Sequence, residues 1–367
     1  MIPTTLPKEL KSQVLEHPKF ATELNRLLAK IRYDYSIGFG LVVGITGVGK
    51  STLMRRLQHV LYEYVKANPE LGLVPPIVLS MHAPERKVFS WRDFYQDSLI
   101  NQLNEPNALK KDDLQRTKDE YQAAGELRKY HAKSIADLRQ FFIHSVNDRK
   151  PAALLVDEVQ ELSKVTSREK AHDNLDVLKS LSDRLRIPVV GFGTSKAYEM
   201  LYNNEQTARR ADVIHFNRYQ GTSADIAVFR DILLATQSQL NIPFAKNIPQ
   251  DVTYFYERTA GCVGVLMDWL KKSIALAIAD RAKVVGIRHL DQAALGGEQI
   301  AALVRKIIEA EQILAAHENY SPINALGEDI NLFEPDKAAS TGSPKRKPGQ
   351  RNPTQDPTGN LLEEALS

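Results

Sequence analysis

Residues 44–52, with the sequence GITGVGKST, combine three glycines, a lysine and three hydroxyl-bearing residues. Their spacing fits G-x-x-x-x-G-K-[ST], which is typical of loops that hold the phosphates of a nucleotide. Glycines let backbone N–H groups turn toward an anion, and the start of the following helix offers further unpaired N–H groups. We expect Lys50 to reach the β- and γ-phosphates and Ser51 to ligate Mg²⁺. The rest of the predicted nucleotide-binding loop comprises Gly44, Thr46, Gly47, Val48, Gly49 and Thr52.

Two adjacent acids close an apolar run further along the chain. Residues 152–156, AALLV, are followed directly by Asp157 and Glu158. A buried strand that ends in acids needs a reason, because unpaired buried charge is costly. We expect Asp157 to bind Mg²⁺, directly or through water, and Glu158 to polarise an attacking water. This pair makes nucleotide hydrolysis, and not binding alone, the expected activity.

A third apolar run, residues 189–193, ends at two hydroxyl-bearing residues, Thr194 and Ser195. Strand ends at the carboxyl edge of an α/β sheet line the ligand crevice. Either hydroxyl can therefore hydrogen-bond the γ-phosphate or the water. A polar turn that leads into the next helix explains each residue equally well.

A pair of arginines, Arg209 and Arg210, precedes the apolar segment 213–216. The planar guanidinium can project into the nucleotide site of a neighbouring subunit and neutralise charge in the transition state. A solvated arginine pair on a loop is the alternative.

The elements that must position these residues are short and alternate in type. The predicted strands are residues 41–43, 77–79, 152–156, 189–190 and 213–214, each rich in apolar or β-branched residues and bounded by Gly, Pro or charge. Helical patterns such as residues 52–66 and 175–185 lie between them. Alternation of this kind predicts an α/β fold with a largely parallel sheet covered by helices.

The chain divides by composition into several parts. We expect a helical lead-in over residues 1–38 and an α/β domain over 39–221 that carries a charged insertion at about 104–134. Helical periodicity over residues 222–320 predicts a separate helical domain. Residues 335–367 are basic, poor in apolar side chains and predicted to be disordered, and their end can tether a partner or act as a spacer.

Composition bounds the class of protein. The chain has 367 residues, a formal net charge of +3 and a pI near 8.7, which is too mildly basic to identify a nucleic-acid partner alone. The single cysteine, Cys262, excludes an internal disulfide, and no Cys/His spacing suggests zinc. We find no signal-peptide pattern and no apolar run long enough to span a bilayer. The expectation is a cytoplasmic protein with no membrane partner.

The motifs taken in order resemble those of an AAA+ ATPase. They are the phosphate loop GITGVGKS, the LLVDE strand, the GFGTSK strand end, the ARRADVIHF segment and the trailing helical domain. Over about residues 15–295, the chain further resembles the transposition regulators TnsC and TniB, relatives of MuB and IstB that serve CRISPR-associated and related Tn7-like transposons. The features that carry this finer resemblance are HPKF, DEVQEL and GCVGVLMDWL, several of which a secretion-type ATPase shares.

The resemblance implies an AAA+ P-loop NTPase fold with a five-stranded parallel sheet and a helical lid, and ATP and Mg²⁺ as cofactors. Such regulators assemble on double-stranded DNA as rings or helical filaments. They link a target-selection protein of TniQ type to transposase subunits and hydrolyse ATP to disassemble. By analogy Asp157 and Glu158 form the Walker B pair, Thr194 or Ser195 is the first sensor, and the arginine finger is Arg209 or Arg210.

One feature departs from many AAA+ lids, which carry an arginine that senses the γ-phosphate. The corresponding stretch, residues 260–266, contains no arginine. Lys271 and Lys272 follow on the same predicted helix, and the response of the lid to hydrolysis is open.

A DNA-binding surface is expected in the charged insertion. Lys129 and Lys133 lie four residues apart and can share a helix face, and Ser134 precedes a predicted helix start whose N–H groups suit a phosphate. A solvated charged helix is the alternative for each lysine. No base-reading motif is present, so DNA binding is expected to be largely independent of sequence. Two rival functions remain open, an ATPase of a secretion or signalling system with a protein partner, and an initiator-like DNA loader.

Overall fold

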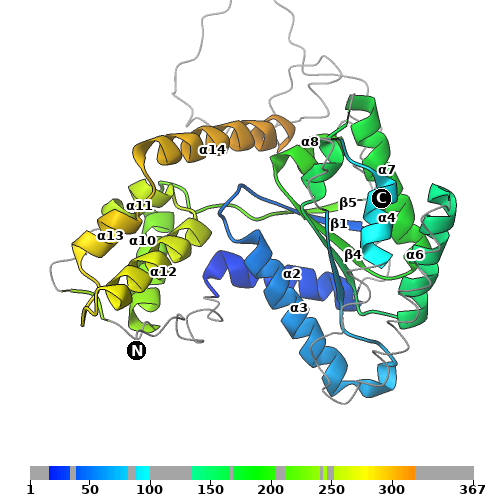
Figure 1. Cartoon of the computed structure of the whole chain (residues 1–367), viewed down its shortest axis with the longest axis horizontal. Helices are drawn as coiled ribbons and strands as arrows, with labels where there is room; N and C mark the ends of the chain where they lie inside the picture. Colours follow the sequence, from blue (N-terminus) through cyan, green and yellow to red (C-terminus); the bar gives the residue numbers. More distant parts are fainter. Residues whose placement is uncertain are drawn as a thin grey trace, which may run out of the picture. The chain divides into compact units, whose positions relative to one another are not determined.

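The computed structural model describes residues 16–33, 39–81, 88–99, 134–165, 168–202, 211–239, 243–245 and 252–318 (Figure 1). The strands are β1 (Phe39–Val43), β2 (Ile77–Ser80), β3 (Leu154–Asp157), β4 (Val189–Gly193) and β5 (Ala211–His215). The helices are α2 (Pro18–Tyr33), α3 (Lys50–Ala67), α4 (Trp91–Asp97), α6 (Ile135–Arg149), α7 (Arg168–Leu185), α8 (Ser195–Tyr202), α10 (Ser223–Gln239), α11 (Val252–Thr259), α12 (Val263–Ala279), α13 (Ile287–Ala293) and α14 (Gly297–Glu318), with short 3₁₀ turns η1 (Pro69–Leu71) and η4 (Val159–Ser163).

The five strands form one parallel sheet in the order β2-β3-β4-β1-β5. The parallel sheet predicted from the apolar runs is therefore confirmed. The ends of the strands differ from the prediction by a few residues. For example, β3 begins at Leu154 and includes Asp157, whose backbone pairs with Ser80 of β2. Asp157 is thus the last residue of its strand, and its side chain emerges at the carboxyl edge of the sheet.

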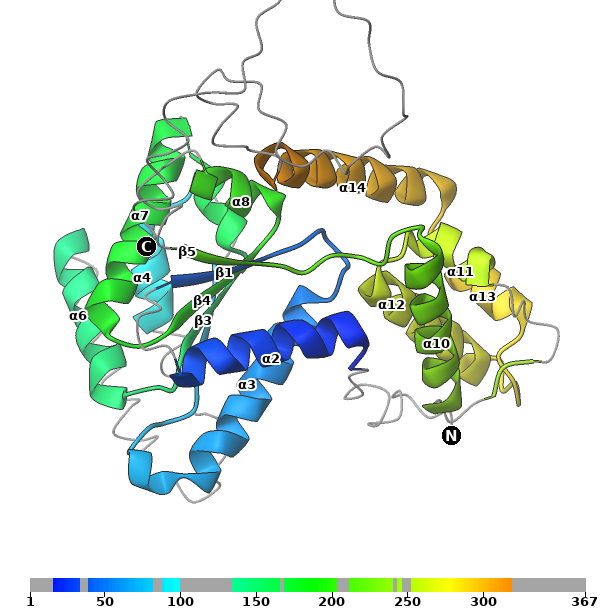
Figure 2. The same cartoon turned by 180° about the vertical axis from the view of Figure 1, so that it is seen from behind.

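Helices cover both faces of the sheet, and alternate residues of each strand face different cores. In β1, Leu41 and Val43 pack with residues of α4, α6, α7 and α8, whereas Val42 packs with α2 and α3. The two views in Figures 1 and 2 show the same division, with α2 and α3 together on one side. Strands buried on both faces explain why the runs are continuously apolar instead of alternating.

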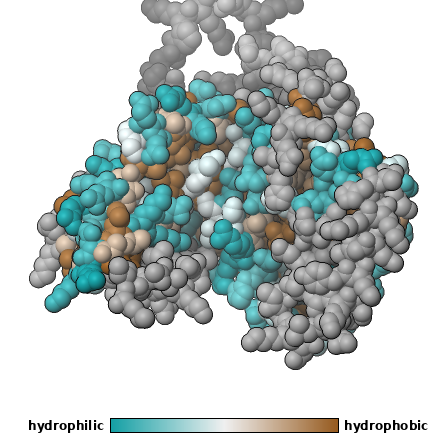
Figure 3. Space-filling model, viewed as in Figure 1, coloured by the Kyte–Doolittle hydropathy of each residue, from teal (hydrophilic) through white to brown (hydrophobic). Residues whose placement is uncertain are grey.

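Helices α10 to α13 form a third core of their own, with the large side chains Phe229, Phe255 and Trp269 at its centre. Helix α14 follows them and packs back on the sheet-containing part of the chain. Its residues Ile307 and Ala310 join the α2–α3 core, and it also contacts α8. The face viewed in Figure 3 mixes hydrophilic and hydrophobic residues, and hydrophobic residues gather near α14.

The lead-in helix α2 buries Phe20, Leu24 and Leu27 in the core that it shares with α3. The charged insertion predicted at about 104–134, apart from Ser134, and the basic tail lie outside the described residues. Among the residues that are described, no helix is both long enough and apolar enough to cross a membrane.

Candidate nucleotide-binding and hydrolytic site

The phosphate loop connects β1 to α3, and its glycines are needed for different reasons. Gly47 and Gly49 have φ values of 86° and 114°, in the left-handed region that side chains rarely adopt. At Gly44 the limit is space, since a Cβ there would lie 2.4 Å from the carbonyl oxygen of Phe216. The loop therefore takes a path that its glycines permit, and Gly49 caps the start of α3.

Lys50 is the first residue of α3, and its amine points back into the loop. The Nζ donates hydrogen bonds to the carbonyls of Gly44 at 2.8 Å and Ile45 at 3.0 Å. Burial lowers the pKa of Lys50 to about 8, while Glu158 and Asp157 act in the opposite direction. The amine is thus held, partly desolvated, where the loop closes on itself.

Ser51, in the first turn of α3, lies next to Asp157 at the end of β3. The Ser51 Oγ lies 3.5 Å from Asp157 Oδ2, and the other carboxylate oxygen accepts the Glu158 N–H at 2.9 Å. A hydroxyl and one carboxylate form the kind of hard oxygen set that Mg²⁺ uses when its other ligands are waters and phosphates. Among the described residues there is no cluster of three or more His, Cys, Asp or Glu side chains that would bind a metal by itself. The residues present fit a magnesium ion carried in with a nucleotide.

Glu158 follows the strand end and adopts a left-handed backbone conformation, with φ 60° and ψ 37°. Its carboxylate is exposed at the pocket and accepts a hydrogen bond from the side-chain amide of Gln160. Left-handed conformations are uncommon outside glycine, and they recur where a side chain must be aimed. The turn directs Glu158 away from the strand, beside Asp157.

Thr194 lies between the two motifs because β4 pairs with both β1 and β3. Its N–H donates to the Gln160 Oε1 at 3.1 Å. Ser195 begins α8 and does not line the pocket. Of the two candidates for a sensing hydroxyl, Thr194 lies at the pocket and Ser195 does not.

One pocket of about 440 Å³ joins these parts. All residues predicted from the phosphate loop and the acid pair except Gly44 line it, and so does Thr194. The lining residues of the two motifs are Thr46, Gly47, Val48, Gly49, Lys50, Ser51, Thr52, Asp157 and Glu158. Gly44 does not line the pocket, and Arg209 and Arg210 lie outside the described residues.

The helical region closes the pocket through the start of α12. The Val265 N–H donates to the Gly47 carbonyl at 3.1 Å. Gly264 packs so closely that a Cβ there would lie 2.4 Å from the same carbonyl oxygen. The stretch 260–266, which contains no sensing arginine, thus contacts the phosphate loop through its backbone. Further along the helix, Lys271 lines the pocket and Lys272 does not.

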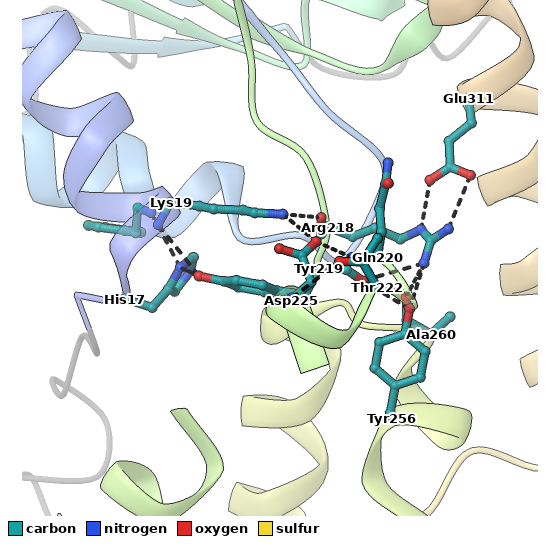
Figure 4. Close-up of polar contacts among 11 residues, drawn as sticks. His17, Lys19, Arg218, Tyr219, Gln220, Thr222, Asp225, Tyr256, Ala260 and Glu311 are labelled. Atoms are coloured by element: carbon teal, nitrogen blue, oxygen red, sulfur yellow. Dashed lines mark hydrogen bonds and ion pairs between the residues drawn. The ribbon is translucent and has the colours of Figure 1, made fainter. Parts of the chain in front are cut away.

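The lead-in also reaches the pocket, through His17 and Phe20. The His17 Nδ1 accepts the Tyr219 hydroxyl at 2.9 Å, as Figure 4 shows, and its ring stacks on Phe216. Burial, with the nearby charge of Lys19, lowers the pKa of His17 to about 4, so the ring is neutral at pH 7. The lead-in is therefore joined to the segment that follows β5.

Of the three residues predicted to contact DNA, the structure describes one, Ser134. Lys129 and Lys133 lie outside the described residues. Ser134 caps α6, where its hydroxyl accepts the Asp137 N–H and the Asp137 carboxylate accepts the Ser134 N–H. A carboxylate on the first turn occupies the position that a phosphate would take and repels it. Phosphate contact at Ser134 stays a prediction, and it would require this carboxylate to be displaced.

Sequence reasoning missed several residues that line the pocket: Arg55, Gln160, Phe192, Val263, Met267 and Asp268. Gln160 had a visible signal, since it lies two positions after the acid pair in DEVQEL. The others belong to helices and strands whose facing sides depend on tertiary packing.

Comparisons with known proteins agree with this geometry. Residues 33–201 match the family model described as an AAA domain. The structure is similar to that of the ORC1 protein of Aeropyrum pernix in complex with DNA, with a TM-score of 0.52, 17% identity, and coverage of 78% of this chain and 67% of that one. No curated protein matches the chain.

Two further solved structures are less similar. Domain III of the replication initiation protein DnaA from Thermotoga maritima has a TM-score of 0.46 and 12% identity, over 78% of this chain and 96% of that one. The Walker-type ATPase paby2304 of Pyrococcus abyssi has a TM-score of 0.45 and 15% identity, over 87% and 79%. These similarities do not distinguish transposition regulators from other branches of the class. The match of residues 33–201 to the AAA-domain model and the phosphate-loop geometry together show an α/β P-loop AAA fold and an ATPase.

Proposed function

We propose that the pocket binds ATP with Mg²⁺ and that the residues at its floor carry out hydrolysis. The observation that carries this is the meeting of Lys50, Ser51 and Asp157 in one pocket with Glu158 beside them. Ser51 and Asp157 would hold the metal ion, which when bound supplies charge neutralisation at the phosphates. The loop amides and Lys50 would hold the phosphates themselves.

The proposed hydrolytic step uses groups of this chain. Lys50 would exchange its two carbonyl acceptors for phosphate oxygens, which are stronger partners for an ammonium ion. Glu158 would orient the attacking water and draw on its proton, and Thr194 would contact the water or the γ-phosphate from the end of β4. Arg209 or Arg210 would act from a neighbouring subunit.

We further propose that the ATPase acts on double-stranded DNA as a transposition regulator in the cytoplasm. It would oligomerise on target DNA, largely independently of sequence, and link a TniQ-type target selector to transposase subunits. Support comes from the ordered motifs and the HPKF, DEVQEL and GCVGVLMDWL features, and from the fold that it shares with an ORC1 protein solved with DNA. Lys129 and Lys133 are the proposed DNA contacts.

A second candidate is an initiator-like DNA loader, which the similarity to ORC1 favours. Both candidates bind duplex DNA, and they differ in their protein partners. Transposase subunits and a TniQ-type protein should co-assemble with the DNA-bound ATPase in the first case and not in the second. An ATPase of a secretion or signalling system would assemble without DNA.

The test compares the wild-type protein with Lys50→Ala and Glu158→Gln on non-specific duplex DNA, by electron microscopy and ATPase assay. We expect DNA-threaded oligomers of the wild type with ATP, no ATP-dependent assembly of Lys50→Ala, and long-lived assemblies of Glu158→Gln with a loss of turnover of about a hundredfold or more. Assembly that is indifferent to DNA would favour the secretion or signalling alternative. Normal turnover by Glu158→Gln would remove the role given to this carboxylate.

A further inference from the structure

Gln160 connects two strand ends at the hydrolytic side of the pocket. It lies in η4, directly after the turn made by Glu158, and its side chain is half-buried and lines the pocket. Its Nε2 donates to the Glu158 carboxylate, and its Oε1 accepts the Thr194 N–H at 3.1 Å. One side chain thus joins the acid after β3 to the backbone at the end of β4.

The two partners leave only one orientation for the amide. A backbone N–H can only donate, so the Gln160 oxygen must face Thr194. The NH₂ group must then face Glu158, whose carboxylate can only accept when it is ionised. Gly193 leaves room for this arrangement, because a Cβ there would lie 3.3 Å from the Gln160 Oε1 and 2.7 Å from the Ala197 Cβ.

The carboxylate that Gln160 holds needs such a constraint. Glu158 is exposed, and its flexible side chain extends from a left-handed residue at the end of a strand. A general base contributes to rate only when it lies within hydrogen-bond reach of the proton that it accepts. Among the described residues, the Glu158 carboxylate accepts one hydrogen bond, from the side-chain amide of Gln160.

We propose that Gln160 is a positioning residue for ATP hydrolysis, which fixes the Glu158 carboxylate relative to Thr194 at the end of β4. This inference rests on the role proposed above for Glu158 as the group that orients water. Its consequence is that a displacement of Thr194, next to the pocket, would move the base through the amide of Gln160. The end of β4 and the base would then act as one unit.

Two substitutions separate positioning from a merely structural link. Gln160→Met removes both hydrogen bonds with little change in volume. Gln160→Glu keeps an acceptor for the Thr194 N–H, so the tie between η4 and β4 is retained, but it removes the donor to Glu158 and places a second negative charge beside it. If Gln160 only ties the backbone, Gln160→Glu should behave as the wild type.

We expect both variants to lose kcat by about 10- to 100-fold, with Gln160→Glu at least as impaired as Gln160→Met, while KM for ATP changes by less than about threefold. Gln140→Met, at an exposed position on α6, is the matched control and should leave both constants unchanged. Thermal unfolding of each variant shows whether the fold persists.

A wild-type kcat in Gln160→Glu, or a rise in KM with kcat unchanged, would overturn the inference. Glu158→Gln measured beside these variants separates the role of Gln160 from that of Glu158. If it is inactive and the Gln160 variants are normal, Glu158 keeps its role and Gln160 loses its own. If Glu158→Gln turns over normally, both roles fail.

Discussion

At the scale of single residues, Lys50 links the state of the phosphate loop to pH. Its amine is buried against two carbonyls of its own loop, and burial lowers its pKa to about 8. A bound triphosphate would place negative charge beside the amine, which favours the protonated form. Binding of ATP above pH 8 should therefore be accompanied by uptake of a proton on Lys50.

This linkage predicts that ATP affinity falls as pH rises above about 8, by up to about tenfold in Kd per pH unit, because one proton is taken up on binding. Below pH 8 the amine is already protonated, and Lys50 should contribute no pH dependence. Titration with a fluorescent ATP analogue at several pH values measures the slope. Lys50→Arg, which stays charged, should bind with a flat profile over the same range. A wild-type Kd that does not change up to pH 10 would show that the amine keeps its charge in the free protein.

The residues of the site differ in how far the sequence predicts them. Lys50, Ser51 and the glycines follow from spacing alone, because the phosphate loop is a local structure whose backbone needs those residue types. Asp157 and Glu158 were predicted from the apolar run that they end. Gln160 and Phe192 were not predicted, because their place at the pocket depends on how β4 pairs with its neighbouring strands and how η4 packs against β4.

At the scale of elements, the contact between α12 and the phosphate loop is made by backbone. Val265 N–H donates to the Gly47 carbonyl, and Gly264 allows the helix to approach this closely. The sequence indicated a helical domain after the sheet, from its periodicity. It did not indicate this docking, since a glycine at the start of a helix has many explanations.

We predict that Gly264→Ala weakens ATP binding and lowers the free energy of unfolding by about 1–3 kcal/mol, because its Cβ would meet the backbone of Gly47 and Gly49, which cannot rotate aside. Gly297→Ala in α14 is the matched control, since a Cβ at Gly297 meets nothing within 4 Å. That variant should be neutral or slightly more stable. Urea unfolding and an ATP titration of both variants check the prediction, and equal behaviour of the two would show that α12 adjusts without cost.

At the scale of the whole described structure, Arg218 connects several separate elements after β5. Its guanidinium donates to both oxygens of Glu311 on α14, at 2.7 and 3.1 Å, and to the Tyr256 hydroxyl on α11 at 3.1 Å (Figure 4). Its carbonyl accepts from Lys19 of the lead-in at 3.0 Å. Because α14 also buries Ile307 in a core of the AAA domain, the helical region is attached both through this segment and through α14.

Arg218→Lys tests whether this junction transmits to the nucleotide site. A lysine keeps the charge, but its three N–H donors cannot replace the five hydrogen bonds that the Arg218 guanidinium makes. Arg218 bonds Tyr256 of α11 and the carbonyl of Ala260, which lies shortly before α12. We therefore predict a loss of about 1–3 kcal/mol in the free energy of unfolding and weaker ATP binding, although Arg218 does not line the pocket. Arg288→Lys, in the more exposed pair with Asp280, is the control and should change stability by less than about 0.5 kcal/mol. Should Arg218→Lys lose stability and still bind ATP as tightly as the wild type, the junction would serve the fold without influencing the site.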